Sequence, residues 1–187
     1  MPLVPEQSRL LALTAGAALF FGAADAHGDP QISAALTVGA GAGELRAPTP
    51  KPLFHLGLHA DVLLFRKRDG QFDFGPYVEV LTRTFETFEA GGGASLLIPI
   101  SEAVPIIVSS GPFLRVSDKG TEGGLNGMLF VGSRSFNFHS VYGFAIGGFA
   151  QARVGFGPTN QLDVLGGLQI DLELLALPFV LLWQAFR

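Results

Sequence analysis

The chain has 187 residues, of which 48% are hydrophobic and only 15% charged, with a net charge of −4 at pH 7 and no cysteine. This composition excludes disulfides, thiolate metal sites and cysteine nucleophiles. It also argues against nucleic acid as a partner, because no basic patch is available to neutralise phosphates. Beyond the N-terminal segment, no apolar run reaches the roughly 18 to 20 residues that a membrane-spanning helix needs.

The N-terminal segment has the pattern of a secretory signal. Residues 10–24 form an apolar run behind Arg9, and Ala24, Asp25 and Ala26 supply the small-x-small pattern that a signal peptidase reads. We expect a cleaved signal peptide over residues 1–26. An uncleaved anchor helix is the alternative, since Glu6 offsets the charge of Arg9.

The rest of the chain alternates between apolar and polar residues with a period of two, which predicts β-strands. The connectors are rich in Gly, Pro, Asp and Asn, as turns are. The expected strands cover residues 31–42, 53–65, 71–84, 87–100, 104–117, 125–136, 140–156 and 161–174. Long strands with short connectors predict an all-β fold: a single eight-stranded antiparallel up-and-down barrel over residues 27–175.

The tail, residues 176–187, is apolar on both faces. It is compatible with a continuation of the last strand, with a ninth strand or with a short interfacial helix. The pattern alone does not separate these three.

Each expected strand has one apolar and one polar face, and the polar face decides where the barrel resides. A soluble barrel turns its apolar face inward, whereas a barrel in a bilayer turns it outward. Lys51, Lys67 and Lys119 all fall in the expected connectors, although a soluble barrel uses lysine freely on its outer face. The strand charges are arginines and carboxylates, which suit enclosed, bidentate ion pairs. We therefore expect a transmembrane barrel with a filled polar interior.

Two sets of residues follow from this assignment. The expected polar network of the lumen comprises His55, His59, Asp61, Asp73, Glu79, Arg83, Glu89, Arg115, Arg134, Gln151, Arg153, Asp163, Gln169, Asp171 and Glu173. The residues expected to face lipid include Phe54, Leu56, Leu58, Phe72, Phe74, Phe144, Ile146, Leu168 and Ile170. Candidates for aromatic bands at the two membrane surfaces are Phe54, Phe72, Phe85, Phe88, Phe136, Phe138, Tyr142 and Phe156.

The signal peptide, the eight alternating strands, the short turns and the Arg, Asp and Glu interior together resemble the small outer-membrane β-barrels of Gram-negative bacteria. This class includes OmpA-like, OmpX-like and OmpW-like proteins. The resemblance implies residence in the bacterial outer membrane, contact with membrane lipid and lipopolysaccharide, insertion by the barrel-assembly machinery and a monomeric state. Residues 43–52 and 117–124 are then expected to form the outward loops.

Three local patterns invite a chemical role. His55, His59 and Asp61 share a strand face, but the two histidines lie ~13 Å apart along a strand, too far for one metal ion. His139 near Ser140, or His55 near Ser33, is a candidate catalytic pair without a recognisable third member. The run at residues 90–95, "AGGGAS", lacks the lysine and helix start of a phosphate loop and favours close packing or strand curvature.

The resulting expectation is a non-enzymatic structural or interaction barrel with no cofactor, closed by an arginine–carboxylate network. A narrow channel for ions or small apolar molecules is the first alternative. A lipid-modifying outer-membrane enzyme and a soluble lipocalin-like carrier are further alternatives.

Overall fold

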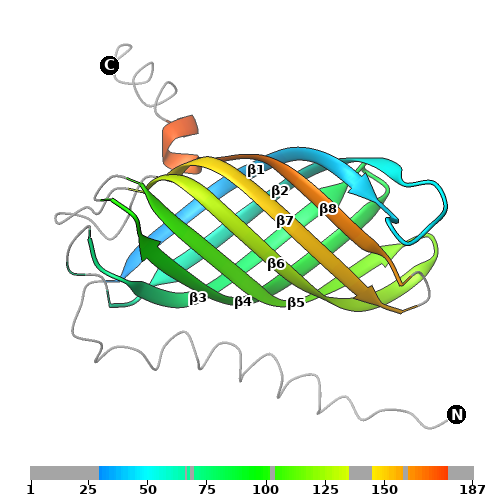
Figure 1. Ribbon diagram of the computed structural model, residues 1–187, viewed down its shortest axis with the longest axis horizontal. Helices are drawn as coiled ribbons and strands as arrows, with labels where there is room; N and C mark the ends of the chain where they lie inside the picture. The colour runs from blue at the N-terminus through cyan, green and yellow to red at the C-terminus, as the bar shows by residue number, and fades with distance from the viewer. Residues whose placement is uncertain are drawn as a thin grey trace, which may run out of the picture.

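The computed structural model describes residues 30–65, 67, 70–101, 104–134, 145–157 and 160–176. These residues form eight antiparallel strands in a closed up-and-down barrel, in which each strand pairs with its sequence neighbours and β1 pairs with β8 (Figure 1). The strands are β1 (Gln31–Gly43), β2 (Lys51–Leu63), β3 (Asp73–Arg83), β4 (Thr87–Pro99), β5 (Pro105–Ser117), β6 (Gly120–Arg134), β7 (Ala145–Phe156) and β8 (Leu162–Asp171). The expected all-β class, strand number and meander order are confirmed.

Three strand bounds differ from the expected ones in ways that matter. β6 begins at Gly120, so the predicted loop 117–124 contracts to a turn at residues 118 and 119. The glycines of this stretch suggested a loop, but backbone pairing with β5 holds them in the sheet. β2 begins at Lys51, so this lysine opens a strand instead of lying in a connector.

The third difference lies at the end of the barrel. β8 ends at Asp171, and residues 172–176 form a short helix in place of the expected last strand residues. Leu, Glu and Ala are good helix formers, and this stretch has no β-branched residue. Among the described residues, no helix combines the length and the hydropathy needed to cross a membrane. The expected signal peptide and residues 177–187 lie outside the described part of the chain.

The two ends of the barrel differ in the segments they carry. We call the end where β1, β3, β5 and β7 finish the mouth, and the opposite end, where β1 begins and β8 finishes, the base (Figure 1). The short helix at residues 172–176 therefore lies at the base (Figure 1).

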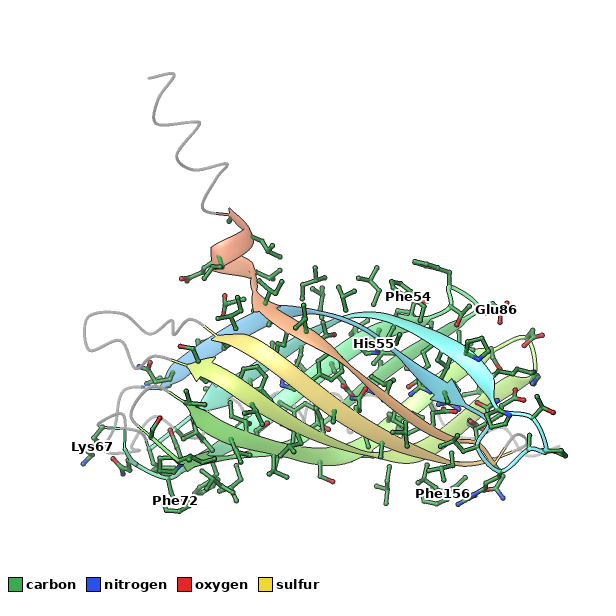
Figure 2. The ribbon with its side chains drawn as sticks, turned by 45° about the horizontal axis from the view of Figure 1, so that its top comes forward. Phe54, His55, Lys67, Phe72, Glu86 and Phe156 are labelled. Atoms are coloured by element: carbon green, nitrogen blue, oxygen red, sulfur yellow. The ribbon has the colours of Figure 1, made fainter. Side chains whose placement is uncertain are left out.

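Burial alternates along most of each strand, with the charged side chains on the buried positions. In the described strands, Lys51 at the mouth is the one charged side chain that is exposed, and every Asp, Glu and Arg of the strands is buried inside the barrel. The outer face carries Val, Leu, Ile and Phe, as the sticks that project from the ribbon in Figure 2 show. Leu168 on β8 is 60% exposed, while Arg153 on the neighbouring β7 is fully buried. The barrel is apolar outside and charged inside.

Candidate functional site

The charged interior is organised around Arg115 on β5. Its Nε donates to Glu89 Oε1 at 2.6 Å, its Nη1 to Glu122 Oε1 at 2.8 Å, and its Nη2 to Asp163 Oδ2 at 2.7 Å. These carboxylates come from β4, β6 and β8. One planar guanidinium therefore joins strands on different sides of the barrel, a geometry that lysine does not provide.

Two further arginines extend this cluster. Arg83 on β3 lies with its Nε 3.0 Å from Glu89 Oε1 and its Nη1 bonded to Asp163. Arg153 on β7 pairs with Glu89 and Glu79. Each of these side chains is at most 5% exposed. Charges buried to this extent are stable only when paired and hydrogen-bonded, which the shared carboxylates achieve.

An aromatic ring and two amides complete the cluster. The ring of Phe113 lies 5.2 Å from Arg115 Cζ and 5.1 Å from Arg153 Cζ, so it contacts both guanidinium groups. Glu79 accepts hydrogen bonds from Asn126 Nδ2 at 2.8 Å and from Gln151 Nε2 at 3.2 Å. The cation–π contacts and the amides hold the like-charged arginines in one small volume.

The base of the barrel is held by a separate ion pair. Arg134 on β6 binds Asp61 on β2 through both carboxylate oxygens, with Nη1 2.7 Å from Oδ2. Near the same end, Asp171 accepts a hydrogen bond from Ser33 Oγ at 3.0 Å, and Asp73 accepts one from the backbone of Phe65 at 2.8 Å. These contacts join the ends of β1, β2, β6 and β8.

The two histidines have different neighbours and do not converge. His55 Nε2 lies 2.9 Å from Thr37 Oγ1, and the ring of His59 stacks on Tyr77 with centroids 5.1 Å apart. The Nε2 atom of His59 is 3.8 Å from Asp61 Oδ2. In the described part of the chain, no group of three or more His, Asp or Glu side chains is arranged to hold a metal ion.

The structure does not bring together His55 and Ser33, which were considered as a candidate catalytic pair. In the register of β1 with β2, Ser33 lies opposite Asp61 and His55 opposite Gly39, so the two residues are several ladder steps apart. Ser33 bonds Asp171 instead. His139 and Ser140 lie outside the described residues.

Of the expected lumen residues, Glu173 is the one that the structure does not bring into the barrel. It follows the end of β8 and belongs to the short helix at residues 172–176, where it is half-buried. The change from strand to helix ends the alternation that had assigned it to the inner face. The remaining members are all buried on inward-facing strand positions.

The residues expected on the outer face also have defined positions. Phe54, Leu58, Phe72, Phe74, Ile146 and Leu168 are exposed, and Leu56 and Ile170 are half-buried. Phe144 lies outside the described residues, as do Phe136, Phe138 and Tyr142 of the expected aromatic bands.

Sequence reasoning missed an apolar cluster inside the barrel. It comprises Leu63, Leu97, Ile107, Met128, Phe130, Ala145, Phe149 and Leu165. The period-two rule places these side chains inward. Phe130 lies an even number of positions from Arg134, and Leu63 lies an even number from Asp61, so each shares a strand face with its charged neighbour. The expected lumen set contained only polar and charged residues, so it left these inward apolar positions out.

Glu122 and Phe113 were also missed. Glu122 fell in the predicted loop 117–124, although it lies an even number of positions from Arg134 in the strand that forms there. Phe113 lies two positions from Arg115 and is 4% exposed. Strict alternation from the arginines would have found both.

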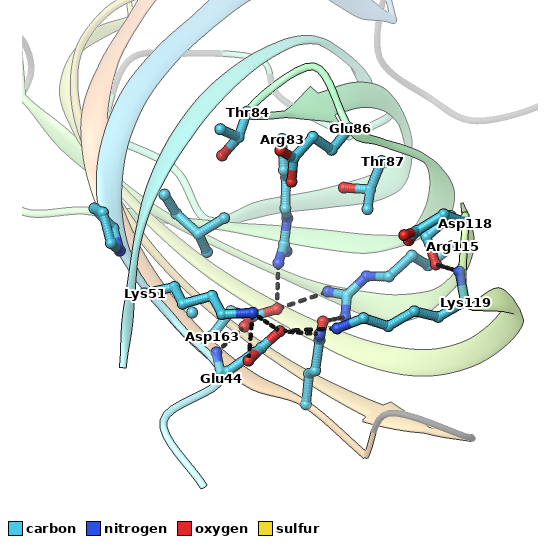
Figure 3. Close-up of a pocket in the computed structure, with 15 residues that line it drawn as sticks. Glu44, Lys51, Arg83, Thr84, Glu86, Thr87, Arg115, Asp118, Lys119 and Asp163 are labelled. Atoms are coloured by element: carbon cyan, nitrogen blue, oxygen red, sulfur yellow. Dashed lines mark hydrogen bonds and ion pairs between the residues drawn. The ribbon is translucent and has the colours of Figure 1, made fainter. Parts of the chain in front are cut away.

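A cavity of about 400 Å³ opens at the mouth above this charged cluster (Figure 3). Arg83, Arg115 and Asp163 lie toward the barrel interior, and Lys51, Lys119 and Glu44 lie at the rim (Figure 3). Glu44 follows β1 directly and has a φ of 55°, in the left-handed region. Its backbone N–H donates to Asp163 Oδ1 at 2.9 Å, which links the rim to the interior.

The carboxylate of Glu44 joins opposite sides of the mouth. Lys51 Nζ on β2 and Lys119 Nζ in the β5–β6 turn each lie 3.2 Å from its Oε1, and Gln161 Nε2 donates to the same oxygen at 3.1 Å. These hydrogen bonds from the two lysines lower the pKa of Glu44 below its usual value of 4.5. Glu44 is thus anionic at neutral pH.

Comparisons with known proteins give no family assignment. No protein-family model matches the chain, and no curated protein shows significant similarity to it.

Proposed function

We propose that this protein is an integral β-barrel of a Gram-negative outer membrane, with a structural or interaction role and no enzymatic activity. The observation that carries the proposal is the distribution of charge: within the described strands, no Asp, Glu or Arg side chain is exposed, and the one exposed charge, Lys51, lines the mouth cavity. An arginine on the lipid face costs about 2 to 4 kcal/mol at the bilayer centre. An apolar outer face all around a barrel is correspondingly costly in water.

The distribution of exposed phenylalanines supports the same proposal. Phe54, Phe85, Phe88 and Phe156 lie near the mouth, whereas Phe65, Phe72 and Phe74 lie near the base (Figure 2). The exposed large hydrophobic residues between these two bands are aliphatic, such as Val78 and Leu129. Outer-membrane barrels have this arrangement of aromatic girdles around an aliphatic belt. The strands, with 10 to 15 residues each, also match or exceed the roughly 9 to 11 needed to cross a bilayer.

The interior favours a closed barrel over a channel. The arginine–carboxylate cluster fills the half toward the mouth, and the apolar cluster that includes Leu97 and Phe130 lies farther inside. An ion that passed through would have to separate buried ion pairs and then enter an apolar region. We therefore propose that the barrel serves as an anchor in contact with lipid and lipopolysaccharide.

Detergent refolding followed by gel electrophoresis tests the membrane assignment. A closed membrane barrel migrates differently before and after boiling, and the refolded protein should also enter preformed lipid vesicles. Identical migration, together with full solubility in buffer without detergent, would instead favour a soluble carrier.

Planar-bilayer recording tests the closed state. We expect conductance at background for the inserted wild-type protein. Steady conductance steps that disappear when Gly91 or Gly147 is replaced by a bulky residue would favour the channel. Loss of a lipid modification in a His59→Ala variant would favour the enzyme.

A further inference from the structure

The mouth cavity contains a set of hydrogen-bond donors that converge on a carboxylate. Lys51, Lys119 and Gln161 come from three separate parts of the mouth, and all three donate to Glu44 (Figure 3). Two ammonium groups and an amide around one oxygen form a donor set suited to a carboxylate group. In this structure the carboxylate of Glu44 occupies the position between these donors.

A second observation lies deeper in the cavity. Arg83 is 3% exposed and lines the cavity, and Figure 3 shows its guanidinium extending into it. Its Nη1 is bonded to Asp163 and its Nε is paired with Glu89, but its buried Nη2 has no hydrogen-bond partner among the described residues. A buried guanidinium donor is costly when left unpaired, so a ligand oxygen that reached this atom from the cavity would satisfy it.

Displacement of the Glu44 side chain would leave the ammonium groups of Lys51 and Lys119 without their carboxylate partner. The guanidinium groups deeper in the cavity keep carboxylates of their own. A ligand that takes the place of Glu44 must therefore supply a negative group to the two lysines. The volume of about 400 Å³ is in the range of small-molecule sites.

We propose that the mouth cavity binds a small hydrophilic monocarboxylate. The ligand carboxylate replaces that of Glu44 on Lys51, Lys119 and Gln161, and a ligand oxygen accepts a hydrogen bond from Arg83 Nη2. Glu44 is then a built-in competitor that lowers the affinity of the site. This site goes beyond the proposed membrane anchor and does not depend on it.

Titration calorimetry on the refolded protein in detergent tests this site with three probes that share one polyol chain. Gluconate carries a negative charge, sorbitol is neutral, and glucamine carries a positive charge. We expect gluconate to bind and the other two to bind at least about tenfold more weakly, as expected for loss of a charge-assisted hydrogen bond. Glucamine binding equal to or tighter than gluconate binding would overturn the proposal, as would the absence of gluconate binding to both the wild type and Glu44→Gln.

Glu44→Gln and Glu86→Gln provide a matched pair. Both remove one negative charge from the cavity lining, but only Glu44 contacts the two lysines. Removing the competitor should tighten gluconate binding about tenfold or more, whereas Glu86→Gln should change it less than about threefold through the general field. Equal effects of the two substitutions, or weaker binding by Glu44→Gln, would contradict displacement.

Lys119→Gln and Arg83→Gln test the two ends of the site. Lys119 is at the rim, so its substitution should leave folding intact and weaken gluconate binding up to about fivefold, the range of an exposed ion pair. Arg83→Gln should weaken binding further, provided that gel migration shows it folded. Unchanged affinity in Lys119→Gln would refute the site.

A barrel that enters vesicles without binding gluconate would refute this site alone, and one that binds gluconate without entering vesicles would refute only the membrane proposal.

Discussion

Arg134 and Asp61 form a two-point ion pair across the inside of the barrel, from β6 to β2. These strands are four apart in the closed order of eight and therefore face each other. Both side chains are at most 2% exposed. The pair acts as a transverse link at the base, and other arginines link opposite strands nearer the mouth.

Removing one partner of this link should destabilise the barrel strongly. Arg134→Met leaves Asp61 buried without its guanidinium, and we expect a loss of about 3 to 5 kcal/mol in the free energy of unfolding. The double variant Arg134→Met with Asp61→Leu should recover most of this loss, because no uncompensated charge remains. Urea unfolding in lipid vesicles, followed by gel migration, measures both; additive losses in the double variant would show that the two residues are not coupled.

An arginine placed on the outer face should show whether that face contacts lipid or water. Val78 lies midway along β3 and is 46% exposed, so Val78→Arg should cost about 2 to 4 kcal/mol in a bilayer. Thr121→Arg is the control, since Thr121 is exposed at the mouth end of β6 and should cost about 0 to 1 kcal/mol. Unfolding in vesicles compares the two variants. Equal stabilities would contradict a bilayer around β3.

The mouth should weaken at acidic pH. The pKa of Glu44 is lowered in the folded barrel by hydrogen bonds from Lys51 and Lys119, so its stabilising contribution is present above the ordinary pKa of 4.5. It is lost as the pH falls through the lower, folded-state pKa. Wild type and Glu44→Gln should therefore differ in unfolding midpoint near neutral pH and converge under strongly acidic conditions. A difference that grows on acidification would contradict this contact.

The glycines at residues 91–93 should be required for close strand packing. A Cβ added to Gly93 would lie 2.2 Å from the carbonyl oxygen of Ser110 on β5, so Gly93→Ala should cost about 1 to 3 kcal/mol through overpacking. Gly127→Ala is the matched control, because a Cβ there meets nothing within 4 Å. Unfolding midpoints of the two variants measure the difference. Full stability of Gly93→Ala would remove the packing explanation for this glycine run.

The alternation of residue types was sufficient to predict the strands and which side chains share a face. Period two fixes the face of each residue once a strand exists, so Asp61, Arg134 and Arg153 could be assigned to one surface from the sequence. The rule failed where glycines concealed the start of β6, and with it Glu122. It failed again where β8 gave way to a helix at Glu173, because the helix propensity of this Leu- and Glu-containing stretch outweighs its alternation.

What the sequence alone determined is the closed eight-stranded meander and the sorting of its side chains into two faces, since both follow from local spacing. Only the tertiary structure decided which arginine binds which carboxylate, where Leu97 and Phe130 interrupt the polar interior, and that Glu44 meets Lys119 across the mouth. Those contacts join residues from 6 to 80 positions apart in the chain, and they depend on the strand register around the barrel, which no local pattern encodes.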